Sequence, residues 1–390
     1  MSILKRSPGD DFTFRLFFEL ASKLPFPKDL IYVWSCVLDP IYEHGSWPKE
    51  GVWVKETELD YRTHLANSIK SDLVVIGVKD HLTSGDFNYL GQRPPIIAEY
   101  LNDLFKFYSS KQFIMLTSVE NAQAYITSPN VKIVPWGGDI TNHQRQYQKL
   151  QPVLDKNLDS TYTFLSLNRN KRAHRAMLVS LLHGLGIQDA GLISCMFKDS
   201  IDDLFEYTNW EVSNTDVYLK GFDVLKSVDL SINDSLEIYH NNNNDNVSNF
   251  KSKLSQYYQD TFVEIVAETS YTEACYNLTE KTLNSIYGCC FPILLCSPGT
   301  VALLREIGLD MFDDIVDHSY DTILDPAERL ECAILKNSEL LINNSRTKHL
   351  WIQNKSRFEK NVDFCRERLY NYYVERSKNT LKEVINDYNV

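Results

Sequence analysis

Long hydrophobic runs are absent from this chain of 390 residues. The longest apolar stretches, Ala176–Leu182 and Phe291–Cys296, have the length of buried core elements, whereas a helix that crosses a bilayer needs about 20 apolar residues. The first residues lead directly to Asp10 and Asp11, without the apolar segment of a secretory signal. The sequence therefore predicts a protein with no membrane span and a cytoplasmic location.

Two short motifs with well-defined chemistry are also missing. The eight cysteines form no C-x-x-C pair, and several lie in apolar runs, where a reduced Cys packs as a small hydrophobic residue. No G-x-G-x-x-G follows a predicted strand, which argues against a Rossmann dehydrogenase. The acidic residues Asp310, Asp313, Asp314 and Asp317 beside His318 are interpreted as turns between short helices, so no metal site is expected.

Positive charge is scarce: 40 Lys and Arg residues face 52 Asp and Glu, which gives a net charge of −12. An acidic chain is poorly suited to a polyanion, so non-specific nucleic-acid binding is disfavoured. With 43% hydrophobic and 24% charged residues, the composition is that of a globular protein with a sizeable core. At about 150 residues per domain, the length indicates two or three domains.

Short apolar runs alternate with helical patterns in the first half, which is typical of parallel α/β structure. Residues 1–28 and 39–70 are interpreted as loops and helices that decorate this half. A helix is expected at Pro95–Ser109, where two prolines mark its start. Strands are expected at Leu30–Leu38, Asp72–Val78, Phe113–Thr117 and Val131–Pro135.

The same alternation returns after the polar segment Gln151–Ser160. From Pro326 onward the chain is predicted to be helical. Strands are expected at Tyr162–Leu167, Gly191–Phe197, Phe262–Ala267 and Pro292–Cys296, and helices at Arg172–Gly184, Thr279–Gly288 and Thr300–Gly308.

Two α/β halves with a helical tail predict two facing Rossmann-like domains, with a ligand cleft between the carboxyl ends of both sheets. The first domain is expected to span residues 1–158 and the second 159–345. Residues 346–390 are expected to form a helical tail that returns to the first domain.

The most cationic loop of the chain follows a predicted strand and leads into a helix. It carries four cations and one His within seven residues, and Asn168, Arg169, His174 and Arg175 are its candidate ligand-binding residues. Cations oppose the dipole at a helix N-terminus, whereas a bound phosphate would offset them. The alternative interpretation is a solvated helix start.

A second group of candidates follows the later strands. Glu268 ends one strand, Thr279 is a candidate N-cap, and Glu280 and Lys281 lie in the first turn of the next helix. A carboxylate there can accept hydrogen bonds from the two hydroxyls of a ribose, while the ammonium can neutralise a phosphate. Ser297 begins a tight turn before another helix and adds backbone donors.

The order of these elements resembles the alpha-1,3-fucosyltransferase family of inverting GT-B glycosyltransferases. Members carry Phe-Glu-Asn, then Tyr-Val-Thr-Glu-Lys, then a Val/Ile-Pro-Ile/Val strand, and bacterial members add Gly-Ser-Pro-Ser. The resemblance covers roughly residues 160–310, although Thr269 replaces the usual Asn. The matching segments here are Ala267-Glu268-Thr269, Thr279-Glu280-Lys281, Pro292-Ile293 and Ser297-Pro298-Gly299.

The resemblance implies that Glu280 holds the ribose, and that Lys281 with an upstream Arg holds the diphosphate of the nucleotide. The family Arg falls on His174 in an ungapped reading, and Arg175 is next to it, so the main diphosphate ligand stays open among Arg169, His174 and Arg175.

The first half carries the candidate general base. Thr117-Ser118-Val119-Glu120-Asn121 looks like the Thr-Gly-Glu-Asn element of bacterial fucosyltransferases, in which the Glu is the base. Inverting transfer needs one carboxylate to deprotonate the acceptor hydroxyl. Glu120 is therefore the predicted catalytic residue, and Asp139 is the substitute candidate. In the alternative interpretation, Glu120 is a loop residue beside a helix start and has no catalytic role.

Together these features predict a metal-independent inverting glycosyltransferase of GT-B fold with no permanently bound cofactor. Its donor would be a nucleoside-diphosphate sugar, with a GDP-sugar such as GDP-fucose favoured by the resemblance and a UDP-sugar as the alternative. The first domain would bind a glycan or other hydroxyl acceptor.

Two other functions remain open. One is a viral DNA-base (hydroxymethylpyrimidine) glycosyltransferase. This function would need a basic face on the first domain to bind DNA, and few basic residues are present to form one. The other is a non-catalytic module that binds nucleotide sugars or glycans. The basic residues of the first half in question are Lys5, Arg6, Lys23, Lys28, Lys106 and Lys111.

Overall fold

The computed structural model groups the chain into two compact units. The first unit comprises Met1–Ser84, Pro94–Gly138 and Asn371–Val390, and the second comprises Gly85–Arg93 and Asp139–Tyr370. The structure describes residues 2–3, 31–34, 73–78, 102, 105–117, 122–135, 147–169, 172–198, 201–208, 210–227, 250, 254–272 and 278–388.

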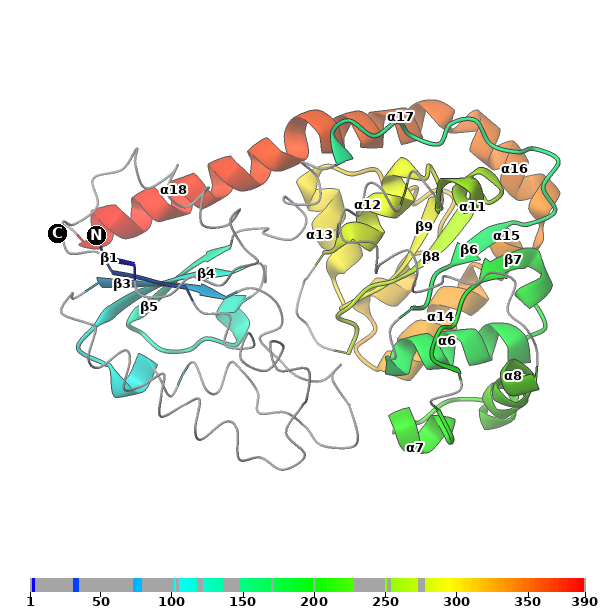
Figure 1. The fold of residues 1–390 in the computed structure, drawn as a ribbon, viewed down its shortest axis with the longest axis horizontal. Coiled ribbons are helices and arrows are strands. Elements are labelled where there is room, and N and C mark those ends of the chain that lie inside the picture. Colours follow the sequence, from blue (N-terminus) through cyan, green and yellow to red (C-terminus); the bar gives the residue numbers. More distant parts are fainter. Residues whose placement is uncertain are drawn as a thin grey trace. The chain divides into compact units, whose positions relative to one another are not determined.

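The first unit contains a parallel sheet whose strands follow the chain order β1-β2-β3-β4-β5 (Figure 1). The four predicted strands are confirmed. The remaining strand, β1, was not predicted: it lies in a segment interpreted as loops and helices. Its two residues are too few to show a strand pattern. The strands are β1 (Ser2–Ile3), β2 (Ile31–Trp34), β3 (Leu73–Val78), β4 (Gln112–Thr117) and β5 (Val131–Pro135), and η1 is Ala122–Ala124.

The last helix, α18 (Tyr370–Tyr388), belongs to this first unit from Asn371 onward. Ser377 Oγ donates a hydrogen bond to the carbonyl of Pro135 at 2.9 Å, and Lys132 forms an exposed ion pair with Asp387 at 3.5 Å. The end of the chain therefore packs beside the edge strand β5.

The second unit contains the parallel sheet β7-β6-β8-β9. All residues of these strands are buried, as expected for a parallel sheet covered on both faces. The α/β class with parallel sheets is thus confirmed. The strands are β6 (Phe164–Ser166), β7 (Gly191–Ile193), β8 (Val263–Ala267) and β9 (Phe291–Leu295).

The strand order reverses between β6 and β8. The chain steps from β6 to β7 on one side and later from β8 to β9 on the other. Right-handed crossovers in opposite directions place their helices on opposite faces of the sheet. Figure 1 shows α6 (Ala173–Gly184) and α12 (Glu280–Tyr287) on opposite sides of the strands.

The other helices of the second unit surround this sheet. Helices α7, α8 and α11 were not predicted from the sequence, whereas α6, α12 and α13 follow their predicted ranges within one residue at each end. They are η2 (Gln188–Ala190), α7 (Leu204–Thr208), α8 (Thr215–Ser227), α11 (Ser255–Gln259), α13 (Thr300–Ile307), η5 (Ser319–Thr322), α14 (Pro326–Lys336), α15 (Ser338–Ile342), α16 (Asn344–Gln353), α17 (Lys355–Phe364) and a π-helical turn (Cys365–Leu369).

The helical tail is divided between the two units. Residues 346–390 are predicted to form a helical tail that returns to the first domain; Asn371 is the first of them in the first unit, and those before it belong to the second. The physical reason lies in buried contacts: Trp351 Nε1 donates to the carbonyl of Cys289 at 2.7 Å, and Arg366 Nη2 donates to the carbonyl of Leu150 at 2.6 Å. None of the described helices is both long and apolar enough to cross a membrane.

Helices α6 and α8 pack closely because glycines face each other's backbone. A Cβ on Gly221 would lie 1.8 Å from the carbonyl oxygen of Ser180, and one on Gly184 would lie 2.0 Å from that of Val217. These atoms belong to helix backbones and cannot move independently. The close approach of the two helices therefore requires both glycines.

We expect Gly221→Ala to destabilise the protein by about 1–3 kcal/mol, because overpacking forces the two helices apart. Lys220→Ala, at an exposed position of the same helix, is the matched control and should stay within about 0.5 kcal/mol of the wild type. Urea unfolding measures both. Equal stability of the two variants would contradict the close packing.

Candidate functional site

The switch in strand order marks the place where open α/β sheets bind ligands, just beyond the carboxyl ends of the two central strands. In the second unit these strands are β6 and β8. Asn168 and Arg169 follow β6, whereas Glu268 and Thr269 follow β8. The structure thus places two of the predicted site segments on neighbouring strands at one edge. Among the described strands, the first unit has no such reversal.

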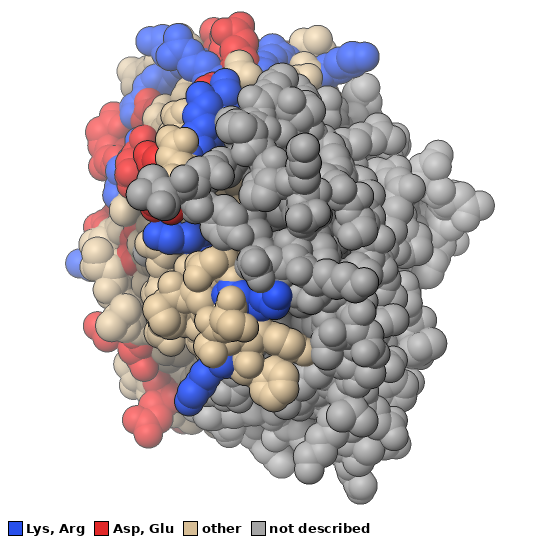
Figure 2. Space-filling view, turned by 90° about the vertical axis from the view of Figure 1, so that its left-hand side faces the viewer, with Lys and Arg blue, Asp and Glu red and all other residues tan. Residues whose placement is uncertain are grey.

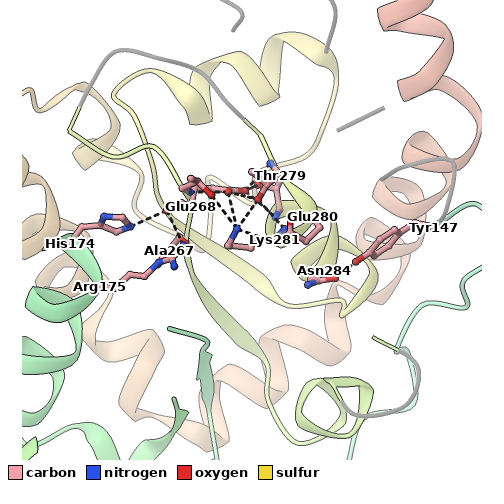
Figure 3. A network of polar contacts seen from close by, with 11 residues as sticks. Tyr147, His174, Arg175, Ala267, Glu268, Thr279, Glu280, Lys281 and Asn284 are labelled. Carbon is pink, nitrogen blue, oxygen red and sulfur yellow. Dashed lines mark hydrogen bonds and ion pairs between the residues drawn. The ribbon is translucent and has the colours of Figure 1, made fainter. Parts of the chain in front are cut away.

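Glu268 turns its carboxylate toward the start of α12 (Figure 3). Oε1 accepts hydrogen bonds from the backbone N–H groups of Thr279 and Thr282, both at 3.2 Å, and from Thr282 Oγ1 at 2.7 Å. Oε2 accepts from Thr279 Oγ1 at 2.6 Å and from the N–H of Thr269 at 3.2 Å. The side chain is 1% exposed, so this predicted ligand contact lies inside the protein.

Thr279, Glu280 and Lys281 form the first turn of α12, as predicted. Thr279 is the N-cap, and its Oγ1 accepts a 3.4 Å hydrogen bond from the N–H of Lys281. Lys281 Nζ lies 3.0 Å from Thr279 Oγ1 and 3.2 Å from Glu280 Oε1. Side chains of Glu280 and Lys281 are 22% and 25% exposed, so both reach solvent at this edge.

His174 and Arg175 project from α6 toward the backbone at the end of β8 (Figure 3). His174 Nε2 donates to the carbonyl of Glu268 at 2.9 Å, and Arg175 Nη2 donates to that of Ala267 at 2.9 Å. Burial, with Arg175 and Arg172 nearby, holds the pKa of His174 well below its usual value. His174 is therefore neutral, and both side chains hold the strand end in the interior.

An aromatic group that was not predicted from the sequence supports His174. The ring of Tyr271 stacks on the imidazole with centroids 4.8 Å apart, and the guanidinium of Arg329 lies 4.3 Å from the centroid of the same ring. Arg329 also donates to the carbonyl oxygens of Tyr271 and Ile323. The position of Tyr271 shortly after Glu268 could have marked it as part of the site. Its contact with Arg329 has no such signal, because the two residues lie 58 positions apart in the sequence.

The loop after β6 has a buried start and a more exposed continuation. Asn168 is buried; its Nδ2 donates to Ser166 Oγ at 2.9 Å, and its backbone N–H donates to Ser194 Oγ at 2.9 Å. Arg169 and Arg172 are each half-buried. Arg172 is the N-cap of α6 and makes no side-chain capping hydrogen bond. These two cations are the ones that this loop offers toward solvent among its described residues.

The turn at Ser297 prepares α13, but an internal carboxylate takes up donors there. Asp321 Oδ1 accepts from the N–H of Val301 and Oδ2 from that of Ala302, both at 3.0 Å. Gly299, with a φ of 85°, is the N-cap of this helix. Ser297 is buried, and its carbonyl accepts a 2.6 Å hydrogen bond from Thr300 Oγ1.

The acidic group in the turns after α13 is occupied by arginines. Arg357 binds both carboxylate oxygens of Asp310, at 2.6 and 2.7 Å, and also reaches Asp314. Arg305 pairs with Asp313. No group of three or more possible metal-ligating side chains is gathered in the part of the chain that the structure describes. The predicted base Glu120 and its substitute Asp139 lie outside the described residues.

No protein-family model, curated protein or solved structure matches this chain.

We expect acid to destabilise the protein partly through His174. Its pKa is lowered by folding, whereas in the unfolded chain it protonates near pH 6.5, so the stabilisation present above that pH is lost as the pH falls below it. His174→Gln keeps an N–H donor for Glu268 but cannot titrate. Its melting temperature should fall less than that of the wild type between pH 7.5 and 5.

His349→Gln is the matched control because His349 is exposed. This control keeps His174 and should therefore show the full pH dependence of the wild type. His183 and His318, whose pKa values burial also lowers, remain in both variants and do not distinguish them. Identical pH profiles for His174→Gln and wild type would contradict a neutral, buried His174.

Proposed function

We propose that the second unit binds a nucleoside-diphosphate sugar at the carboxyl edge of β6 and β8, and that the protein is an inverting glycosyltransferase. The observation that carries this proposal is the arrangement of charge at that edge. Arg169 and Arg172 follow β6, and Lys281 stands on the helix after β8, all half-buried in an otherwise acidic protein.

The three helix starts at this edge differ in their charge. Carboxylates of the protein itself already accept N–H donors at α12 and α13, from Glu268 and Asp321. The first turn of α6 has no acidic residue and no side-chain cap. Cations at a helix N-terminus are unfavourable with the helix dipole, and a diphosphate between them would offset that cost.

Each half-buried side chain then has a role that suits its chemistry. Arg169 and Arg172 would bind diphosphate oxygens as planar donors, and Lys281 would add a point charge. Glu280 would accept hydrogen bonds from the ribose hydroxyls. His174 and Arg175, which the resemblance offers as diphosphate ligands, would instead hold the end of β8 from the interior.

The reaction would proceed at the anomeric carbon of the donor sugar. The acceptor oxygen forms a bond to that carbon as the bond to the diphosphate oxygen breaks, and Glu120 would take the acceptor proton. The cations would stabilise the charge that develops on the leaving diphosphate. The GT-B arrangement, a glycan acceptor on the first unit and a GDP-linked sugar such as GDP-fucose rest on the resemblance, with a UDP-sugar as the alternative.

Transfer to viral DNA bases is disfavoured by the net charge of −12, because a polyanion is repelled by an acidic protein. Figure 2 shows one face of the molecule, on which the described Lys and Arg residues are interspersed with Asp and Glu. DNA-binding proteins gather positive charge along one face. A non-catalytic module that binds nucleotide sugars would share the site and is separated from the enzyme by turnover.

A thermal-shift screen against GDP, UDP, ADP, CDP and their sugars tests the proposal. A ligand at about 100 times its Kd stabilises the folded state by about 2.7 kcal/mol, which raises the midpoint by roughly 5–10 °C. One nucleotide family should give this shift. Glu280→Ala and Lys281→Ala should abolish it, whereas the exposed control Lys220→Ala should retain it.

Release of the nucleoside diphosphate in the presence of glycan acceptors then separates an enzyme from a binding module. A shift with UDP ligands alone would keep the site but reject GDP-fucose as donor. Failure of every nucleotide to shift the wild type would contradict the proposal.

A further inference from the structure

Glu268 has its capacity for hydrogen bonding filled by the chain. An ionised carboxylate offers about four lone-pair positions and donates nothing. Five donors from Thr269, Thr279 and Thr282 already approach its two oxygens within 3.2 Å. A sugar or ribose hydroxyl would have to displace one of them from a side chain that is 1% exposed.

The contacts of Glu268 replace a capping box. In that motif the N-cap side chain and a Glu or Gln three residues later satisfy the first N–H groups of a helix. Here Thr279 is the N-cap, but the residue three positions later is Thr282. The carboxylate comes instead from Glu268, 14 residues before Thr282, so it joins the end of β8 to α12.

The same carboxylate acts on the cation of the site. Lys281 Nζ lies 3.9 Å from Glu268 Oε2 and also contacts Thr269 Oγ1 at 3.3 Å. An isolated buried carboxylate would be costly, but these donors and the ammonium compensate it. The negative charge therefore lies where a phosphate would otherwise meet the N–H groups and the dipole at the start of α12.

We propose that Glu268 is a positioning residue that determines specificity: it is the internal anion that fills the start of α12, keeps phosphate away from it and fixes Lys281 beside it. The diphosphate is thereby directed to Arg169 and Arg172 next to α6, with the Lys281 ammonium beside it. This routing of the diphosphate rests on the proposed function, whereas the internal anion does not.

Removal of the charge should create anion binding, which a loss of structure cannot do. Glu268→Ala leaves the donors of Thr279, Thr282 and Lys281 without their carboxylate. We expect its affinity for inorganic pyrophosphate, measured by isothermal titration calorimetry, to exceed that of the wild type by about tenfold or more, the size of one charge-assisted hydrogen bond.

Glu268→Gln guards against a variant that fails to fold, since its amide oxygen can still accept from Thr282. It should melt below the wild type and also gain affinity for pyrophosphate. Thr282→Val removes one donor to Oε1 but keeps the negative charge. This matched control should lose stability without any gain in pyrophosphate affinity.

A folded Glu268→Gln protein with weakened nucleotide binding and no gain for pyrophosphate would overturn the proposal and make Glu268 a ligand contact. An unchanged melting temperature with unchanged pyrophosphate affinity would overturn it as well. If the wild type binds no nucleotide, the proposed function fails, while the comparison with pyrophosphate still decides the role of Glu268.

Discussion

The candidate site depends on the hydrogen bonds that hold the end of β8 between helices α6 and α12. Helix α6 holds the backbone of this strand end, because His174 and Arg175 donate to two successive carbonyl groups. Helix α12 holds its side chain, because the Glu268 carboxylate accepts from the first turn of that helix. Helices from both faces of the sheet are thereby joined through two residues of one strand end, and the half-buried cations lie around it.

This arrangement separates two uses of charge at one sheet edge. Buried charges of the protein satisfy its own backbone: Glu268 and Asp321 accept N–H donors, while Arg175 and Arg329 donate to carbonyl groups. The half-buried cations Arg169, Arg172 and Lys281 lie at the rim, where they reach solvent. The distinction explains why residues of similar type close together in the sequence receive different roles.

Most of the secondary structure could be predicted from local sequence patterns. Strand β5 has the predicted bounds, and Thr279 is the N-cap expected from its position before Glu280 and Lys281. Both signals lie within a few residues of the element that they specify. In β6 and β7, apolar residues continue beyond the hydrogen-bonded pairs, so both strands are shorter than predicted.

The partners of the site residues depend on contacts between distant segments. Nothing near Asp321 in the sequence shows that it accepts from α13, and nothing near Arg329 shows that it covers Tyr271. His174 looks like a candidate ligand because it lies among cations, yet its burial follows from the packing of α6 against β8. Residue type and order were therefore enough to find the edge of the sheet, but not to separate its internal side chains from its exposed ones.

The most direct test of the account is amide hydrogen exchange with and without the nucleoside-diphosphate sugar that stabilises the protein. Ligand at the carboxyl edge of β6 and β8 should slow exchange in residues 164–175 and 263–287, while α8 on the same unit should exchange as before. Protection confined to segments outside this edge, with residues 164–175 and 263–287 unchanged, would contradict the account.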